Sequence, residues 1–96
     1  MNVLVTYDVS TTSAEGRRRL RRVAQACKDF GQRVQFSVFE CVVGEKELFL
    51  LRHRLLEEID REEDSLRIYR LAANLVEGVE CYGQQRTIDF EGPLVV

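Results

Sequence analysis

Two kinds of apolar spacing alternate along this chain of 96 residues, and their order limits the fold more than any other feature. Residues 3–8 form a short run rich in β-branched side chains, which predicts a strand. Apolar residues then recur at helical spacing over residues 14–30. Thr12 and Glu15 match a capping box before that segment, and Gly31 ends it. The chain therefore opens with a strand that leads directly into an amphipathic helix.

The rest of the chain continues this alternation. We expect a strand over residues 33–43, a helix over 45–60, strands over 65–71 and 79–82, a helical segment over 72–76 and a short strand over 87–90. This order predicts an α+β protein, a ferredoxin-like βαββαβ sandwich with an extra C-terminal strand. Residues 1–96 then form one domain, which is too small for a cleft between two lobes, so a partner must build part of any deep site.

The predicted strands carry apolar side chains on both faces. In the first strand, Val3 and Val5 lie on one face and Leu4 on the other, and the strand over 33–43 divides its apolar residues in the same way. A sheet that has two helices on one face is expected to be polar on the other face. The sequence therefore predicts a homodimer, in which a second copy covers the apolar face of the sheet.

Asp8 is the first candidate for chemistry, because it ends the first strand and is followed by a turn rich in hydroxyl side chains. Carboxylate and hydroxyl oxygens are hard ligands that suit Mg²⁺ better than zinc. The alternative is an Asp that only initiates the turn. If a two-fold axis brings two copies of Asp8 together, the pair can hold one magnesium ion per dimer, and this ion could activate water for attack on a phosphodiester.

The predicted first helix is strongly basic. Residues 1–33 contain seven basic and three acidic side chains, whereas residues 34–96 contain seven basic and 13 acidic ones. The basic cluster consists of Arg17, Arg18, Arg19, Arg21 and Arg22. With few acids nearby and arginine used in preference to lysine, the cluster indicates phosphate binding through the backbone of a nucleic acid. A solvated basic face is the alternative, and the acidic run over residues 57–64 is expected to face away from the binding surface.

Several classes of protein are excluded. No apolar run is long enough for a membrane span, and the first residues read as a strand and not as a signal peptide. The three cysteines are widely spaced, which predicts buried, reduced thiols in a cytoplasmic protein. Glycine-rich nucleotide-binding loops and the serine-hydrolase motif are absent from the sequence.

Three segments, in this order, resemble the CRISPR-associated endonuclease family, the small ferredoxin-like component of the spacer-acquisition machinery. The segments are Tyr7-Asp8-Val9-Ser10 before the arginine-rich helix, Gly31-Gln32-Arg33-Val34-Gln35-Phe36-Ser37-Val38-Phe39-Glu40, and Leu66-Arg67-Ile68-Tyr69-Arg70-Leu71. The resemblance extends over nearly the whole chain, and the Val-Gln-x-Ser-Val-Phe-Glu segment is its most specific part.

The resemblance implies a homodimer with facing sheets, in which residues 87–96 form a strand and a tail that exchanges with the partner. It places the metal-binding and catalytic aspartate at Asp8. It places nucleic-acid contacts on the arginine-rich helix and at Arg33. Supporting roles fall on Tyr7, Ser37 and Phe39, the last two acting from the partner side. It also implies a second partner, the CRISPR integrase, whose dimers the protein bridges on duplex DNA.

Three functions remain open from the sequence. The first is a magnesium-dependent endonuclease that acts on RNA or DNA, with Asp8 at its centre. The second is a non-catalytic DNA-binding scaffold that bridges integrase dimers. The third is a ferredoxin-like regulatory module that binds a small molecule, which leaves the arginine cluster without a role. The first two differ in whether Asp8 is needed.

Overall fold

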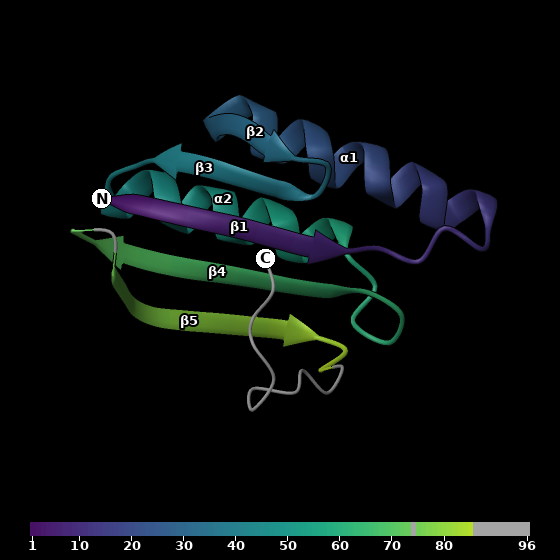
Figure 1. Cartoon of the computed structure of the whole chain (residues 1–96). Helices are drawn as coiled ribbons and strands as arrows, with labels where there is room; N and C mark the ends of the chain where they lie inside the picture. Colours follow the sequence, from purple (N-terminus) through teal and green to yellow (C-terminus); the bar gives the residue numbers. More distant parts are fainter. Residues whose placement is uncertain (74, 86–96) are drawn as a thin grey trace.

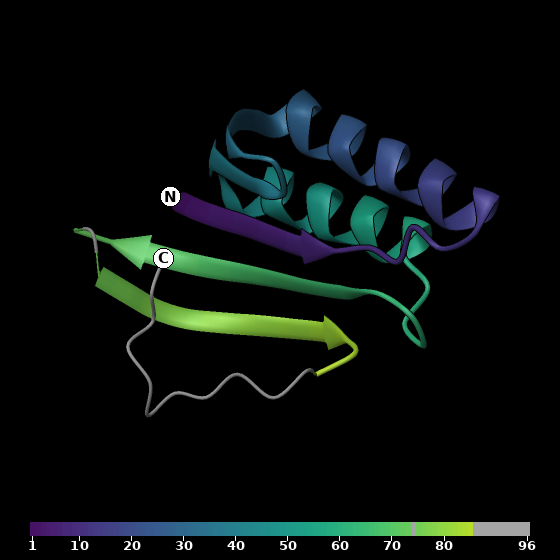
Figure 2. The same ribbon diagram turned by 45° about the vertical axis from the view of Figure 1, so that its right-hand side comes forward.

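One antiparallel sheet of five strands carries both helices on the same face (Figures 1 and 2). The computed structural model describes residues 1–73 and 75–85. In chain order the elements are β1 (Asn2–Asp8), α1 (Ala14–Phe30), β2 (Gly31–Gln35), β3 (Val38–Val42), α2 (Glu45–Glu58), β4 (Ser65–Ala72) and β5 (Leu75–Gly83). The strand order β2-β3-β1-β4-β5 makes β1 the central strand. The predicted ferredoxin-like α+β fold is confirmed, and β5 is the additional strand.

The single strand expected over residues 33–43 is wrong, because this segment forms the hairpin of β2 and β3. Phe36 and Ser37 make the turn, and a register irregularity falls between Arg33 and Gln35. Apolar residues continue through the turn without glycine or proline, so the sequence gives no local signal for it. The Phe36 side chain is 92% exposed at this turn and does not lie on a sheet face.

The helical segment expected over residues 72–76 is also wrong. Ala73 has a positive φ of 49° in a tight turn, and β5 then begins at Leu75, which pairs with Ala72. β5 is therefore longer than the strand expected over 79–82. The strand expected over 87–90 and the exchange tail lie outside the described residues.

The core forms between the helices and one face of the sheet, as the alternation in β1 predicts. Val3, Val5 and Tyr7 of β1 are buried, together with Phe39 and Cys41 of β3 and Leu66 and Ile68 of β4. The helices cover them with Val23, Cys27, Leu48, Leu51 and Leu55. Fully burying each of these large side chains contributes about 1.5–3 kcal/mol to folding.

The opposite face of the sheet remains open and is partly apolar. Val42 is 78% and Val79 is 48% exposed, and Leu4 and Tyr69 between them are half-buried. Cys81 is exposed, which corrects the expectation of three buried thiols, whereas Cys27 and Cys41 are buried. Burial raises the pKa of the Cys27 thiol to about 12. No helix in the described part of the chain is long and apolar enough to cross a membrane.

The Glu80 carboxylate fixes β5 to α2 and to β4. It accepts hydrogen bonds from Nε and Nη2 of Arg52 at 2.7 and 3.0 Å, from Arg70 at 3.1 Å and from the Tyr82 hydroxyl at 2.7 Å. The hydrogen bonds from Arg52 lower the pKa of Glu80 to about 2, because their effect is larger than that of burial, which raises the pKa. The outermost strand is thus held by a charge cluster on the helix side of the sheet.

Asp64, just before β4, is fully buried and joins its own turn to the loop after β1 and to α1. Its carboxylate accepts hydrogen bonds from the backbone N–H of Ser10 at 3.0 Å and of Asp60 at 2.9 Å, and from Nε of Arg19 at 2.9 Å. Burial by itself raises the pKa of Asp64, but the bonds from Arg19, Asp60 and Ser10 outweigh it and the pKa is lowered. Asp64 therefore holds the loop after β1, the start of β4 and α1 together.

Replacing Asp64→Asn should lower the free energy of unfolding by about 2–3 kcal/mol, because buried donors lose their charged acceptor. Urea titration at neutral pH measures this loss. Since folding lowers the pKa of Asp64, its stabilisation is present above the unfolded-state pKa of about 4 and disappears as the pH falls through the folded-state value. The difference between the two proteins should therefore shrink below about pH 4.

Glu63→Gln is the matched control, because Glu63 binds the same arginine at 3.2 Å but its side chain is 52% exposed. An exposed ion pair contributes less than about 1 kcal/mol. Equal losses in the two variants would contradict a special role for Asp64.

Candidate functional site

Asp8 ends β1 on the open face of the sheet. Along β1 the side chains alternate, so that Tyr7 is buried in the core and Asp8 and Thr6 lie on the other face. Asp8 pairs in register with Ser65 of β4, and Thr6 pairs with Arg67. The Asp8 carboxylate is therefore exposed at the end of the central strand, where a second copy of the chain can approach it.

The loop between Asp8 and α1 is held firmly. The N-cap of α1 is Ser13 and not Thr12, because the Ser13 hydroxyl accepts a hydrogen bond from the Gly16 N–H at 3.0 Å. The Ser10 and Thr12 hydroxyls lie 3.2 Å apart and hydrogen-bond to each other. Gly16 allows the close approach of this loop, since a Cβ at that position would lie 1.9 Å from the carbonyl oxygen of Ser10. The Ser13 hydroxyl therefore caps the helix, and those of Ser10 and Thr12 bind each other within the loop.

A hollow of about 270 Å³ lies beside Asp8 on the strand side. It is lined by Thr6, Tyr7, Asp8, Ser65, Arg67, Tyr69 and Gln84. The Arg67 guanidinium donates a hydrogen bond to the Tyr69 hydroxyl at 3.2 Å, which holds it over the sheet. Arg67 thus brings a positive charge to the same hollow as the Asp8 carboxylate.

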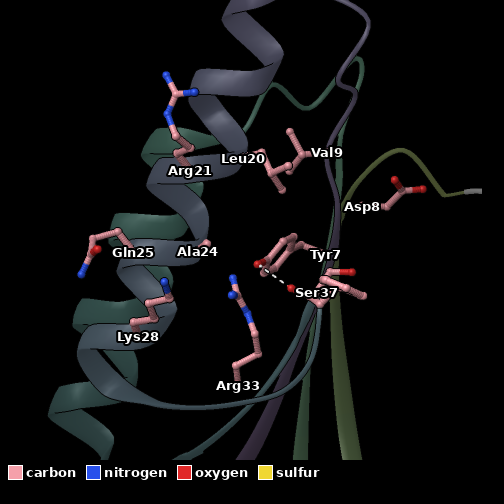
Figure 3. Close-up of a pocket in the computed structure, with 11 residues that line it drawn as sticks. Tyr7, Asp8, Val9, Leu20, Arg21, Ala24, Gln25, Lys28, Arg33 and Ser37 are labelled. Carbon is pink, nitrogen blue, oxygen red and sulfur yellow. Dashed lines mark hydrogen bonds between the residues drawn. The ribbon is translucent and has the colours of Figure 1, made fainter.

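A second, larger groove of about 570 Å³ lies between α1 and the β2–β3 turn. Figure 3 shows Arg21, Gln25, Lys28 and Arg33 around this groove. Asp8 also belongs to its lining, but the carboxylate of Asp8 points away from the basic side chains. Leu20, Ala24 and the exposed Phe36 add an apolar lining. Basic and apolar side chains together suit the phosphates and the bases or sugars of a nucleic acid.

Tyr7 connects this groove to the core. Its ring stacks on Phe39 with centroids 6.1 Å apart, and its hydroxyl donates to the carbonyl oxygen of Phe36 at 3.4 Å. The Arg33 guanidinium lies 5.1 Å from the centre of the Phe39 ring. Burial raises the pKa of Tyr7, and Arg33 opposes this shift. The Tyr7 hydroxyl is therefore protonated at neutral pH.

Ser37 and Phe39, the other expected supporting residues, lie beside Tyr7 in the same chain. Ser37 accepts a hydrogen bond from the Tyr7 N–H at 3.1 Å through its carbonyl oxygen, and it lines the groove. Phe39 is fully buried under Tyr7. The partner-side role expected for Ser37 and Phe39 stays a prediction.

The arginines of α1 divide into separate sets. Arg19 is bound to Asp64 and Glu63, and Arg22 forms an ion pair with Glu58 at 3.6 Å. Arg17 donates to the carbonyl oxygen of Thr11 at 3.3 Å. The acidic run was expected to face away from the binding surface. For Arg19 and Arg22 this expectation is wrong, because α2 and the turn after it pack beside the first half of α1.

Arg18 is exposed and shares a hollow with both acidic and basic side chains, namely Glu15, Glu57, Glu58, Arg19 and Arg22. Arg21 is the one member of the basic cluster that lines the large groove, where Arg33 joins it from β2. Sequence reasoning missed Gln25 and Lys28, although their spacing of four and seven residues from Arg21 places all three along one helix face. It also missed Arg67. Side chains alternate along β4, so that Ile68 is buried in the core and Arg67 lies on the same face of the sheet as Asp8.

A single chain offers only part of a ligand set for a magnesium ion. Among the described residues, no group of three or more acidic, histidine or cysteine side chains could hold a metal. Magnesium commonly keeps several waters and binds one or two carboxylates. The carboxylate of the exposed Asp8 is a donor of the kind that magnesium binds, and one chain offers a single such carboxylate at this strand end.

The chain was compared with known proteins. A family model described as CRISPR associated protein Cas2 matches residues 1–77. The chain is 57% identical over 96 residues to the CRISPR-associated endoribonuclease Cas2 1 of Moorella thermoacetica, with 100% of both chains covered. It is 54% identical over 95 residues to the CRISPR-associated endonuclease Cas2 of Halalkalibacterium halodurans, with 99% of both covered. The crystal structure of Streptococcus pyogenes Cas2 at pH 6.5 is 55% identical, with a TM-score of 0.71 over 77% of this chain and 89% of that one.

Replacing Gly16→Ala should destabilise the protein and loosen the loop next to Asp8. Alanine favours a helix over glycine by about 1 kcal/mol, but a Cβ 1.9 Å from the Ser10 oxygen forces the backbone apart. We expect a net loss of about 1–3 kcal/mol, measured by urea titration. The control is Gly78→Ala, because a Cβ there meets nothing within 4 Å. A Gly16→Ala variant as stable as Gly78→Ala would contradict the close packing of this loop.

Proposed function

The chain belongs to the family of CRISPR-associated Cas2 proteins, and from this premise we propose that two copies form a magnesium-dependent endonuclease of CRISPR adaptation. The observation that carries the proposal is the exposed Asp8 at the end of the central strand, on the open face of the sheet. The names of the relatives, endoribonuclease and endonuclease, support phosphodiester hydrolysis. Three cysteines that form no disulfide are consistent with the cytoplasm, where we place the protein.

The homodimer is supported by the open face of the sheet. Leu4, Val42 and Val79 lie on it, and together with Tyr69 they form a partly apolar surface that a single chain leaves in water. Packing this face against its own copy removes it from water and is self-complementary across a two-fold axis. The same packing brings the two Asp8 side chains toward each other, which neither chain achieves alone.

In this arrangement the two Asp8 carboxylates hold the metal, and other residues hold the nucleic acid. Bound there, magnesium would polarise the phosphodiester and lower the pKa of an attacking water. Arg21, Lys28 and Arg33 bind backbone phosphates in the groove beside α1. Arg19 is not part of this contact set, because Asp64 and Glu63 occupy its guanidinium. Arg17, Arg18 and Arg22 add to the positive field at the outer surface of α1.

A specific observation favours a second candidate, a non-catalytic scaffold. The groove that gathers Arg21, Lys28 and Arg33 lies on the helix side of β1, whereas Asp8 points away from it (Figure 3). A duplex can therefore be held in the two grooves of a dimer without a phosphate reaching Asp8. In this role the dimer bridges two integrase dimers on duplex DNA, a function that needs the basic groove and not the aspartate.

Asp8→Ala should abolish cleavage and leave binding of nucleic acid nearly intact. The reason is that the basic side chains bind the phosphates, whereas Asp8 lies at the edge of the groove with its carboxylate pointing away from it (Figure 3). The measurement is a magnesium titration with labelled RNA and with duplex DNA, following cleavage by gel and binding by fluorescence anisotropy. Glu77→Ala on β5 removes the same charge from an exposed position and should keep wild-type cleavage. Wild-type cleavage by Asp8→Ala, or no cleavage by wild type, would leave the scaffold as the function.

Binding of duplex DNA should weaken steeply with salt, because arginine and lysine contacts to phosphate release counterions. Removing one contact, in Arg33→Gln or Lys28→Gln, should lower the slope of log Kd against log salt by about one in each case. Lys46→Gln, on the exposed surface of α2, removes the same charge and should leave the slope unchanged. A slope that is flat in wild type, or equal in all four proteins, would refute binding in the groove.

A further inference from the structure

Arg67 lies on β4 within the open face of the sheet, next to the candidate catalytic residue. It is paired in register with Thr6, and Asp8 is paired with Ser65, so Arg67 and Asp8 are diagonal neighbours across the two strands. Such neighbours have side chains about 7–8 Å apart, a gap that a phosphate group can bridge. Both residues line the hollow of about 270 Å³.

The charge of Arg67 has no acidic partner within the described part of the chain. An ion pair is formed there by each of Arg19, Arg22, Arg52, Arg54 and Arg70. Arg67 instead donates one hydrogen bond to the Tyr69 hydroxyl. Arg67 is half-buried, and a guanidinium has five N–H donors in a fixed fork. Most of these donors remain available for an anion, and Tyr69 fixes the direction of the fork.

A phosphodiester bound over the site is negative and is stabilised by a cation at close range. The proposed magnesium lies at the Asp8 carboxylates, and a second cation beside it would bind the remaining non-bridging oxygens. The basic residues of the large groove lie on the other side of β1 and do not face the Asp8 carboxylate (Figure 3). Among the described residues that line the hollow beside Asp8, Arg67 is the only cation.

We propose that Arg67 is a substrate-binding residue of the nuclease site. Its guanidinium binds the non-bridging oxygens of the phosphodiester that lies over Asp8, and the Tyr69 hydroxyl positions it for this contact. A planar fork that meets two phosphate oxygens suits arginine and not lysine. The inference rests on the proposed function, and it extends the site from the end of β1 to the middle of β4.

The experiment compares wild type, Arg67→Gln, Arg67→Lys and the control Lys46→Gln, as full-length proteins. The probes are a single-stranded RNA and a DNA duplex of the same sequence. Cleavage gives kcat and KM, and anisotropy without magnesium gives Kd as a function of salt. We expect Arg67→Gln to lose tenfold or more in kcat/KM, roughly as when a charge-stabilising donor is removed from an active site. Arg67→Lys should recover only part of this loss, and Lys46→Gln should match wild type.

In the binding arm, Arg67→Gln should weaken binding and lower the salt slope by about one. Thermal melting and sedimentation are measured for each variant. The losses of activity and of binding should occur without a change in the melting temperature or in the oligomeric state. Where Arg67→Gln fails to fold, Arg67→Lys carries the comparison.

Wild-type Kd and kcat/KM in Arg67→Gln would overturn the inference. Full recovery of activity and of the oligomeric state by Arg67→Lys would also overturn it, because the residue would then act as a contact between copies. Absence of cleavage by wild type refutes the nuclease function instead, and the binding arm then still decides whether Arg67 contacts phosphate.

Discussion

The buried carboxylate of Asp64 is the interaction on which the rest of the structure depends. It accepts hydrogen bonds from the loop after β1, from the turn before β4 and from Arg19 of α1. Each of these segments flanks the end of β1, where Asp8 emerges. A single acceptor with no solvent contact thus sets the direction in which the loop leaves β1, and it also fixes α1 and the groove beside it. Because the carboxylate is both buried and fully bonded, its loss would be felt at all three segments together.

The two faces of the sheet have different tasks. The helix side contains the core and, at its margin, a groove in which basic side chains of α1 meet Arg33 of β2. The open side carries Asp8, Arg67 and the apolar residues suited to a second copy. This division underlies the proposed function, in which one small domain binds nucleic acid on one side and offers half of a hydrolytic site on the other. Under that proposal, mutations can affect binding and spare cleavage, or the reverse.

Much of the fold follows from local pattern. The alternation in β1, the helical spacing of α1 and α2 and the order of elements lead to the ferredoxin-like sheet, because each reflects a face that must be buried. The β2–β3 turn was not predicted, because the segment contains neither glycine nor proline. The turn at Ala73 was not predicted either. The alanine-rich segment favours a helix locally, but the pairing of β5 with β4 overrides this preference. Tertiary hydrogen bonds, and not propensity, decided both.

The sequence by itself determined the fold class, the family resemblance and the position of Asp8 at a strand end, because these depend on residues close together in the chain. Only the tertiary structure decided how the charges are distributed. It paired Arg19 with Asp64 and Arg22 with Glu58 across 45 and 36 residues, and it assembled the groove from Arg21, Lys28 and Arg33. It also placed Arg67 beside Asp8. The sequence gives the number and order of charged residues, but which of them face one another depends on how the strands and helices pack.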